Sequence, residues 1–89
     1  MAGTLHIFRL HNAPLEYQVN YNLGAASWVK VLTPQHLDEF LRLGSGLPEA
    51  EVHALLRELA ESGHATQGWV KIGESHLAEM GFAETPSEV

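Results

Sequence analysis

The chain has no cysteine among its 89 residues, so disulfides, thiolate metal sites and cysteine nucleophiles are excluded. It also has only 5 basic residues against 11 acidic ones, which gives a formal net charge of −6. That charge repels a polyanion at long range unless the basic side chains gather on one face. They are scattered along the sequence, so nucleic acid is not the partner we expect. The basic residues are Arg9, Lys30, Arg42, Arg57 and Lys71.

Long hydrophobic runs are absent as well. No stretch approaches the roughly 20 apolar residues of a membrane-spanning helix, and the N-terminus lacks the basic and then apolar segments of a signal peptide. We therefore expect a cytoplasmic protein without a membrane partner. The length suits one domain. Apolar periodicity is confined to residues 4–82, so residues 1–3 and 83–89 are predicted to be flexible ends.

The N-terminal third is typical of β-strands. Residues 15–22, LEYQVNYN, alternate between apolar and polar side chains, as a half-buried strand does. Residues 4–10, TLHIFRL, are rich in strand-forming residues, and the turn-forming sequence HNAP separates the two segments. The sequence therefore predicts an antiparallel β-hairpin. A third strand is predicted at residues 28–32, WVKVL.

Two helices are predicted next. Thr33 can cap a backbone N–H and Pro34 suits the first helical position, so a helix is expected over residues 34–43. Residues 48–62 carry one apolar stripe at helical spacing, and Gly63 ends this second helix. The stripe consists of Val52, Leu55, Leu56 and Leu59. A strand at 69–72 and a short helix ending near Met80 complete the prediction.

Two stretches are near-copies of one another: WVKVLTPQHLDEF at 28–40 and WVKIGESHLAEM at 69–80. Each is interpreted as a strand that turns directly into a capped helix. Alternation in a strand predicts that Trp and Lys face one side of the sheet and that Val with Val or Ile faces the other. A duplication within the chain would explain the likeness. So would the small set of residue types that strand-to-helix junctions use, and both explanations stay open.

The order of elements over residues 28–82 resembles a winged helix-turn-helix domain. LPEAEVHALLRELAESGHA is similar to that family's second helix running into its wing, and WVKIGESHLAEMGF is similar to the last wing strand with a closing helix. The resemblance implies that strands 28–32 and 69–72 pair with each other. The predicted fold class is α+β, with an N-terminal antiparallel β-hairpin followed by a winged-helix-like β-α-α-β-α core.

The resemblance implies that the second helix would enter the DNA major groove, but here that helix opens with Glu49 and Glu51. Its outward face suits a protein partner better. Small alanines allow close approach, and charged side chains fix orientation. The candidate interaction residues are Ala50, His53, Ala54, Arg57, Glu58 and Glu61. A merely solvated helix face is the alternative.

The polar side of residues 15–22 is a second candidate surface. Gln18 and Asn20 would lie beside an unprotected strand edge, which can accept a strand from another chain. An ordinary polar sheet face is the alternative here.

The sequence offers no catalytic, cofactor or metal motif. Its six histidines form no H-E-x-x-H or comparable pattern, and no nucleophile elbow or phosphate-binding glycine loop is present. We therefore expect a non-enzymatic module that acts through contacts with an unidentified protein partner. The alternatives are a DNA-binding transcriptional regulator of winged-helix type and a self-associating homodimeric accessory protein.

Overall fold

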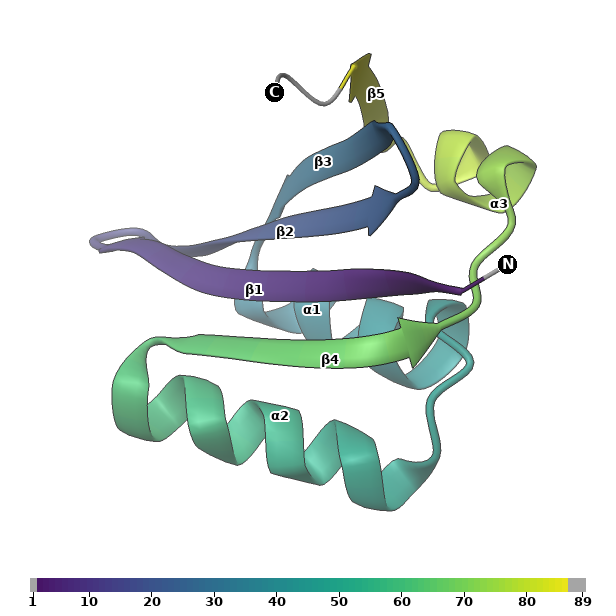
Figure 1. Ribbon diagram of the computed structural model, residues 1–89. Coiled ribbons are helices and arrows are strands. Elements are labelled where there is room, and N and C mark those ends of the chain that lie inside the picture. Colours follow the sequence, from purple (N-terminus) through teal and green to yellow (C-terminus); the bar gives the residue numbers. More distant parts are fainter. Residues whose placement is uncertain (1, 87–89) are drawn as a thin grey trace.

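The predicted hairpin is confirmed in a computed structural model that describes residues 2–86. Strands β1 (Gly3–Asn12) and β2 (Leu15–Leu23) pair antiparallel, with Ile7 opposite Val19. Three further strands extend the sheet in both directions: β3 (Ala26–Leu32), β4 (His64–Val70) and β5 (Ala83–Pro86). All neighbours are antiparallel and the strand order is β4-β1-β2-β3-β5 (Figure 1). The protein is thus α+β, with more strands than the sequence predicted.

The strand order overturns the edge hypothesis for residues 15–22. β2 is the central strand, paired with β1 on one side and with β3 on the other. Its backbone groups are used within the sheet, so Gln18 and Asn20 do not flank an open edge. Among the described residues, the edges of the sheet are β4 and β5.

The order also corrects the pairing that the winged-helix resemblance implied. Residues 28–32 lie in β3, whereas Trp69 and Val70 end β4, and β1 and β2 separate the two strands. The expected short wing and the first two residues of the strand predicted at 69–72 form one strand, which begins at His64, pairs with β1 and ends at Val70, so Lys71 and Ile72 lie outside it. A resemblance in apolar spacing does not determine pairing partners, because the N-terminal hairpin inserts itself between β3 and β4.

The predicted helices are confirmed with one local change. Helix α1 (Pro34–Glu39) continues into a π-helical turn, η1 (Phe40–Gly44), and α2 (Glu49–Ser62) and α3 (Glu74–Glu79) follow. The Thr33 hydroxyl accepts a hydrogen bond from the His36 N–H at 3.3 Å, as its capping role predicts. The Ser45 N–H donates to the Phe40 carbonyl five residues back at 2.9 Å, which widens the last turn of the first helix.

One face of the sheet carries the core. Alternate residues of β1 and β2, such as Leu5, Ile7, Val19 and Tyr21, are fully buried beneath the helices. In α2 the buried residues are Val52, Leu55 and Leu59, whereas Leu56 is only half-buried against the core. Within residues 2–86, no helix covers the opposite face of the sheet, as Figure 1 shows.

The expected flexible ends are also corrected. Gly3 belongs to β1 and pairs with Val70, and residues 83–86 form β5 against Ala26–Val29. Met1 and residues 87–89, which share that prediction, lie outside the described residues. None of the helices within residues 2–86 is both long and apolar enough to cross a membrane.

Candidate functional site

The two near-copies bury opposite sides of their strands. In β3, Trp28 is 6% exposed and Lys30 is half-buried on the same face, while Val31 is 44% exposed. In the second copy the pattern inverts: Val70 is buried and Trp69 is 90% exposed. The prediction that Trp and Lys share a face holds within β3, but the two copies are not equivalent in their strand halves.

A β-bulge causes the inversion. Gly3 pairs with Val70 and Leu5 pairs with Gln67, so β4 has one more residue than β1 over this interval. Gly68 and Trp69 together lie opposite Thr4. The extra residue shifts the alternation by one position, which turns Val70 toward the core and Trp69 toward solvent.

Trp69 has a backbone conformation that bulky residues rarely adopt. Its φ is +60°, and it is the one non-glycine with positive φ among the residues that the structure describes. Such a conformation costs on the order of 1–3 kcal/mol for a residue with a Cβ and persists only where the surroundings enforce it. The backbone that follows Trp69 is fixed by the buried Tyr21 hydroxyl, which donates to the Val70 carbonyl at 2.5 Å and accepts from the Ile72 N–H at 3.3 Å.

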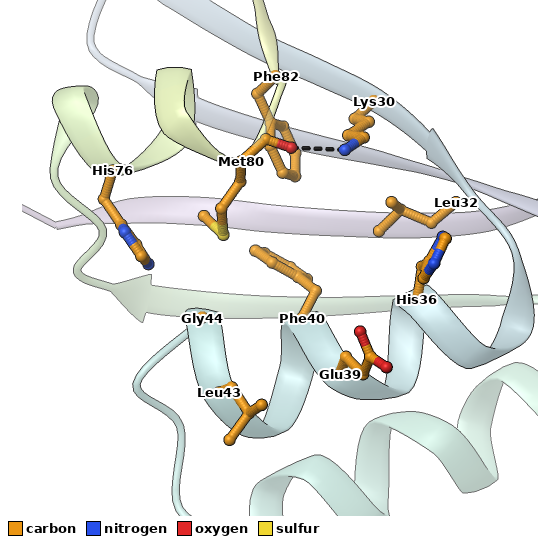
Figure 2. Close-up of a pocket in the computed structure, with 10 residues that line it drawn as sticks. All are labelled: Lys30, Leu32, His36, Glu39, Phe40, Leu43, Gly44, His76, Met80 and Phe82. Atoms are coloured by element: carbon orange, nitrogen blue, oxygen red, sulfur yellow. Dashed lines mark hydrogen bonds between the residues drawn. The ribbon is translucent and has the colours of Figure 1, made fainter.

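The helical halves of the two copies, by contrast, are equivalent and face each other. Leu37 and Leu77 are both buried, and the residues that follow them at the same spacing, Phe40 and Met80, line one groove between η1 and α3. Figure 2 shows Phe40 and Met80 in the middle of this groove, with His36 and His76 toward its two ends. Its volume is about 390 Å³, within the range of small-molecule sites.

The groove wall is apolar and includes the π-helical turn. The rings of Phe40 and Phe82 are 5.3 Å apart and inclined at 43°, a favourable tilted contact. Gly44 allows Met80 to lie close, because a Cβ at this position would be 2.8 Å from Met80 Sδ. Single π-helical turns are frequent at functional sites. Leu43, on the rim, is 84% exposed.

Lys30 is the cationic side chain of the groove lining. It is half-buried, and its ammonium donates to the Met80 carbonyl, as Figure 2 shows. Among the residues that the structure describes, no carboxylate lies within 4.0 Å of this ammonium, not even that of Glu39 on the groove rim. The lining therefore combines an apolar wall with one positive charge that has no anionic partner in the described part of the chain.

The histidines do not gather. No group of three or more His, Asp or Glu side chains within the described residues is placed to hold a metal ion. His36 and His76 lie at opposite ends of the groove in Figure 2. His53 on α2 instead contacts Glu49, with 3.0 Å between its Nε2 and Glu49 Oε1.

The predicted interaction residues of α2 all lie exposed on its outer face. They are Ala50, His53, Ala54, Arg57, Glu58 and Glu61. Nearby, Arg42 donates to Asp38 at 3.0 Å and also to Glu49, which ties η1 to the start of α2. The hydrogen bond from Arg42, with a second from His53, holds the pKa of the Glu49 carboxyl below its usual range. The same contacts with Glu49 and then Asp38 raise the pKa of Arg42.

Gln18 and Asn20 lie half-buried on the uncovered face of the sheet, where the Gln18 amide donates to Asn20 Oδ1 at 2.8 Å. The exposed face of α2 belongs to the helical layer on the other side. The structure therefore does not bring the two predicted sets together into one site.

Sequence reasoning missed three features: the exposure of Trp69, the π-helical turn and the groove around Lys30. A signal for the first was present. The apolar Ala65 has one alternation phase and the apolar Val70 and Ile72 have the other, with Gly68 between them. A phase change across a glycine indicates a bulge. The groove had no comparable signal, because its lining comes from segments more than 30 residues apart.

The chain matches no known protein-family model, no curated protein sequence and no solved structure significantly. The geometry of its own surface is therefore the basis for a functional argument.

Proposed function

We propose that this protein is a non-enzymatic interaction module that binds a protein partner across the edge strand β4 and the neighbouring face of α2. The observation that carries the proposal is Trp69, which is 90% exposed and has a positive φ. So exposed a side chain contributes almost nothing to packing within the described chain. Its backbone nevertheless has an unfavourable positive φ, which lowers the stability of the fold. A partner that buries the indole accounts for both facts.

The energetics of such a contact are favourable. A tryptophan offers roughly 150–250 Å² of surface to bury, and tryptophans are over-represented among interface residues whose truncation costs 2 kcal/mol or more. The backbone that follows Trp69 is also held before binding, because the Tyr21 hydroxyl bonds the Val70 carbonyl and the Ile72 N–H. Binding then loses less conformational entropy than it would with a mobile anchor.

The charge of the molecule defines the chemistry of the partner. The net charge is −6, and Glu51, Glu58 and Glu61 are exposed on α2. Figure 1 shows α2 running alongside β4. The partner we propose therefore has an apolar pocket for Trp69 beside a basic surface for these carboxylates, while Ala50 and Ala54 permit close approach.

The alternative of a DNA-binding regulator is less well supported. Three of the five basic side chains are engaged within the chain: Arg9 donates to the Leu59 carbonyl at 2.9 Å, Lys30 to Met80, and Arg42 to Asp38 and Glu49. The winged-helix likeness of residues 28–82 stays a likeness of apolar spacing and carries no part of the proposal. Self-association through the β2 edge is excluded by the strand order, so a homodimer would have to use another surface.

Affinity capture from cells of the source organism tests the proposal, with Trp69→Gly as the variant and Leu43→Ser as the matched control. Glycine adopts a φ of +60° freely, so the fold should be retained. Leu43 is similarly exposed but lies on the groove rim. We expect a partner that binds the wild type and Leu43→Ser directly, and that binds Trp69→Gly on the order of thirtyfold more weakly.

Equal affinity of the purified partner for Trp69→Gly and the wild type would refute the proposal. Two further measurements on the wild type separate the alternatives. Micromolar binding to random duplex DNA with a steep salt dependence would favour the alternative of a DNA-binding transcriptional regulator. A dimer in sedimentation velocity that Trp69→Gly dissociates would identify the partner as a second copy of this chain.

A further inference from the structure

We propose that the groove between η1 and α3 binds a small amphipathic carboxylate, such as a medium-chain fatty acid, with the carboxylate on Lys30 and the tail along Phe40, Met80 and Phe82. This site is separate from the β4 surface around Trp69 and does not depend on it.

The Lys30 ammonium has hydrogen-bond donors that the described part of the chain does not use. An ammonium has three donors, and the Met80 carbonyl takes one of them. The side chain is half-buried on the helix-covered face of β3, in register with the buried Val19. A charge withdrawn from water without a counter-ion is costly. A carboxylate can accept the remaining N–H groups through both of its oxygens.

The wall of the groove is the second argument. Beside Lys30, the lining includes Leu32, Phe40 and Phe82, which are buried to 95%, 94% and 95% respectively, yet border an open volume of about 390 Å³. Met80 adds a flexible thioether that can adapt to an irregular apolar surface. An alkyl tail laid on this wall removes further apolar area from water, at about 25 cal/mol per Å².

The charge count selects a singly charged ligand. One ammonium matches one carboxylate, whereas a phosphate dianion would face a single lysine, the neighbouring Glu39 and a molecule of net charge −6. A cationic amphiphile would be repelled by Lys30. A neutral one would leave the ammonium without an anion.

The test compares three ligands that share one tail and differ in charge: decanoate, decyltrimethylammonium and decanol. Each is titrated below its micellar concentration into ¹⁵N-labelled protein and followed by amide chemical shifts. We expect saturable shifts with decanoate at Lys30, Phe40, Gly44, Met80 and Phe82. Decyltrimethylammonium should bind more weakly than decanoate, by a factor on the order of ten or more. The reason is that it cannot accept the hydrogen bond from the Lys30 ammonium, and a hydrogen bond to a charged group contributes about 1.5–3 kcal/mol.

Two matched substitutions complete the test. Lys30→Met retains the aliphatic stem and removes the charge, so decanoate affinity should fall on the order of tenfold. Lys71→Met changes the corresponding lysine of the second near-copy, which is exposed and does not line the groove, and it should leave the affinity unchanged. Trp69→Gly should also leave it unchanged, which separates this proposal from the proposed protein interaction.

Three results would overturn the inference. The first is equal affinity for decanoate and decyltrimethylammonium. The second is unchanged decanoate affinity in Lys30→Met. The third is an absence of shifts at the groove amides. The ligand comparison uses the wild type alone, so it decides the matter even if Lys30→Met does not fold.

Discussion

Trp28 and Trp69 occupy the same place in two near-identical stretches of sequence, yet Trp28 is 6% exposed and Trp69 is 90% exposed. The difference in exposure comes from the β-bulge in β4, between the pairs Gly3–Val70 and Leu5–Gln67. The bulge shifts the alternation of β4 by one residue. Two near-identical stretches thus supply a buried side chain in one strand and an exposed side chain in the other.

Replacement of Trp69 by glycine should stabilise the fold. Glycine relieves the positive φ of +60°, and the gain exceeds its greater loss of backbone entropy, so we expect the free energy of unfolding to rise by about 1 kcal/mol. Trp69→Ala is the control, because alanine keeps the unfavourable backbone conformation and should stay within about 0.5 kcal/mol of the wild type. Urea unfolding measures both. Equal stability of the two variants would show that the conformation of residue 69 is not strained.

Core substitutions in α2 should differ according to burial. Leu55 is 2% exposed, so Leu55→Ala should cost about 2–5 kcal/mol, the usual range for a leucine truncated in a packed core. Leu56 is only half-buried beside the core, so Leu56→Ala should cost about 1 kcal/mol. Urea unfolding of the two variants gives the comparison. A larger loss for Leu56→Ala would mean that the inward face of α2 is misassigned.

The difference in burial between Leu55 and Leu56 illustrates how far the sequence could predict the fold. The apolar spacing of α2 determines that a stripe exists but leaves its centre uncertain by one residue, and Val52, Leu55 and Leu59 prove to be its buried members. The hairpin, β3 and the positions of the helices were similarly local and were predicted correctly, apart from the π-helical turn over Phe40–Gly44. Capping by Thr33 and alternation over residues 15–22 depend only on neighbours in sequence.

Strand pairing beyond the N-terminal hairpin was not predictable in this way. Which strands neighbour β3 depends on the packing of segments far apart in the chain, and the strand at residues 83–86 lacks apolar periodicity of its own. The candidate groove was missed for the same reason. Lys30 and Met80 are 50 residues apart, and only the tertiary fold brings the ammonium to the end of α3.

The Arg42–Glu49 pair should contribute to stability in a pH-dependent way. The pKa of Glu49 is lowered in the folded protein, chiefly by the hydrogen bond from Arg42. A carboxyl with a depressed folded pKa stabilises the fold fully above its unfolded value of about 4.3, and the contribution is lost as the pH falls through the folded pKa. Glu49→Gln should therefore lower stability slightly at about pH 6 and have no effect well below the folded pKa.

Glu51→Gln is the matched control for this prediction, since Glu51 lies in the same first helical turn and has no ion pair among the described residues. Urea unfolding across the acid range gives the free energies. The same pH dependence for both variants would attribute the effect to the helix dipole and not to Arg42.

The Tyr21 hydroxyl should be important for stability and for the presentation of Trp69. Tyr21 is fully buried, and its Oη bonds both the Val70 carbonyl and the Ile72 N–H. Tyr21→Phe leaves two backbone groups without their partner and should cost about 1–3 kcal/mol. Tyr17→Phe, at a half-buried position of the same strand, should cost less than about 0.5 kcal/mol. The two losses are compared by urea unfolding.

A double-mutant cycle then tests whether Tyr21 holds Trp69 in its unfavourable conformation. If it does, loss of the hydroxyl lets the backbone of Trp69 relax and recover part of its strain, whereas glycine has no strain to recover, so the loss caused by Tyr21→Phe should be larger in the Trp69→Gly background by about 0.5 kcal/mol or more. Strict additivity would mean that the hydroxyl stabilises the end of β4 without enforcing the backbone of Trp69. In that case the bulge itself, through the pairing of Gly3 with Val70, is what turns the indole toward solvent.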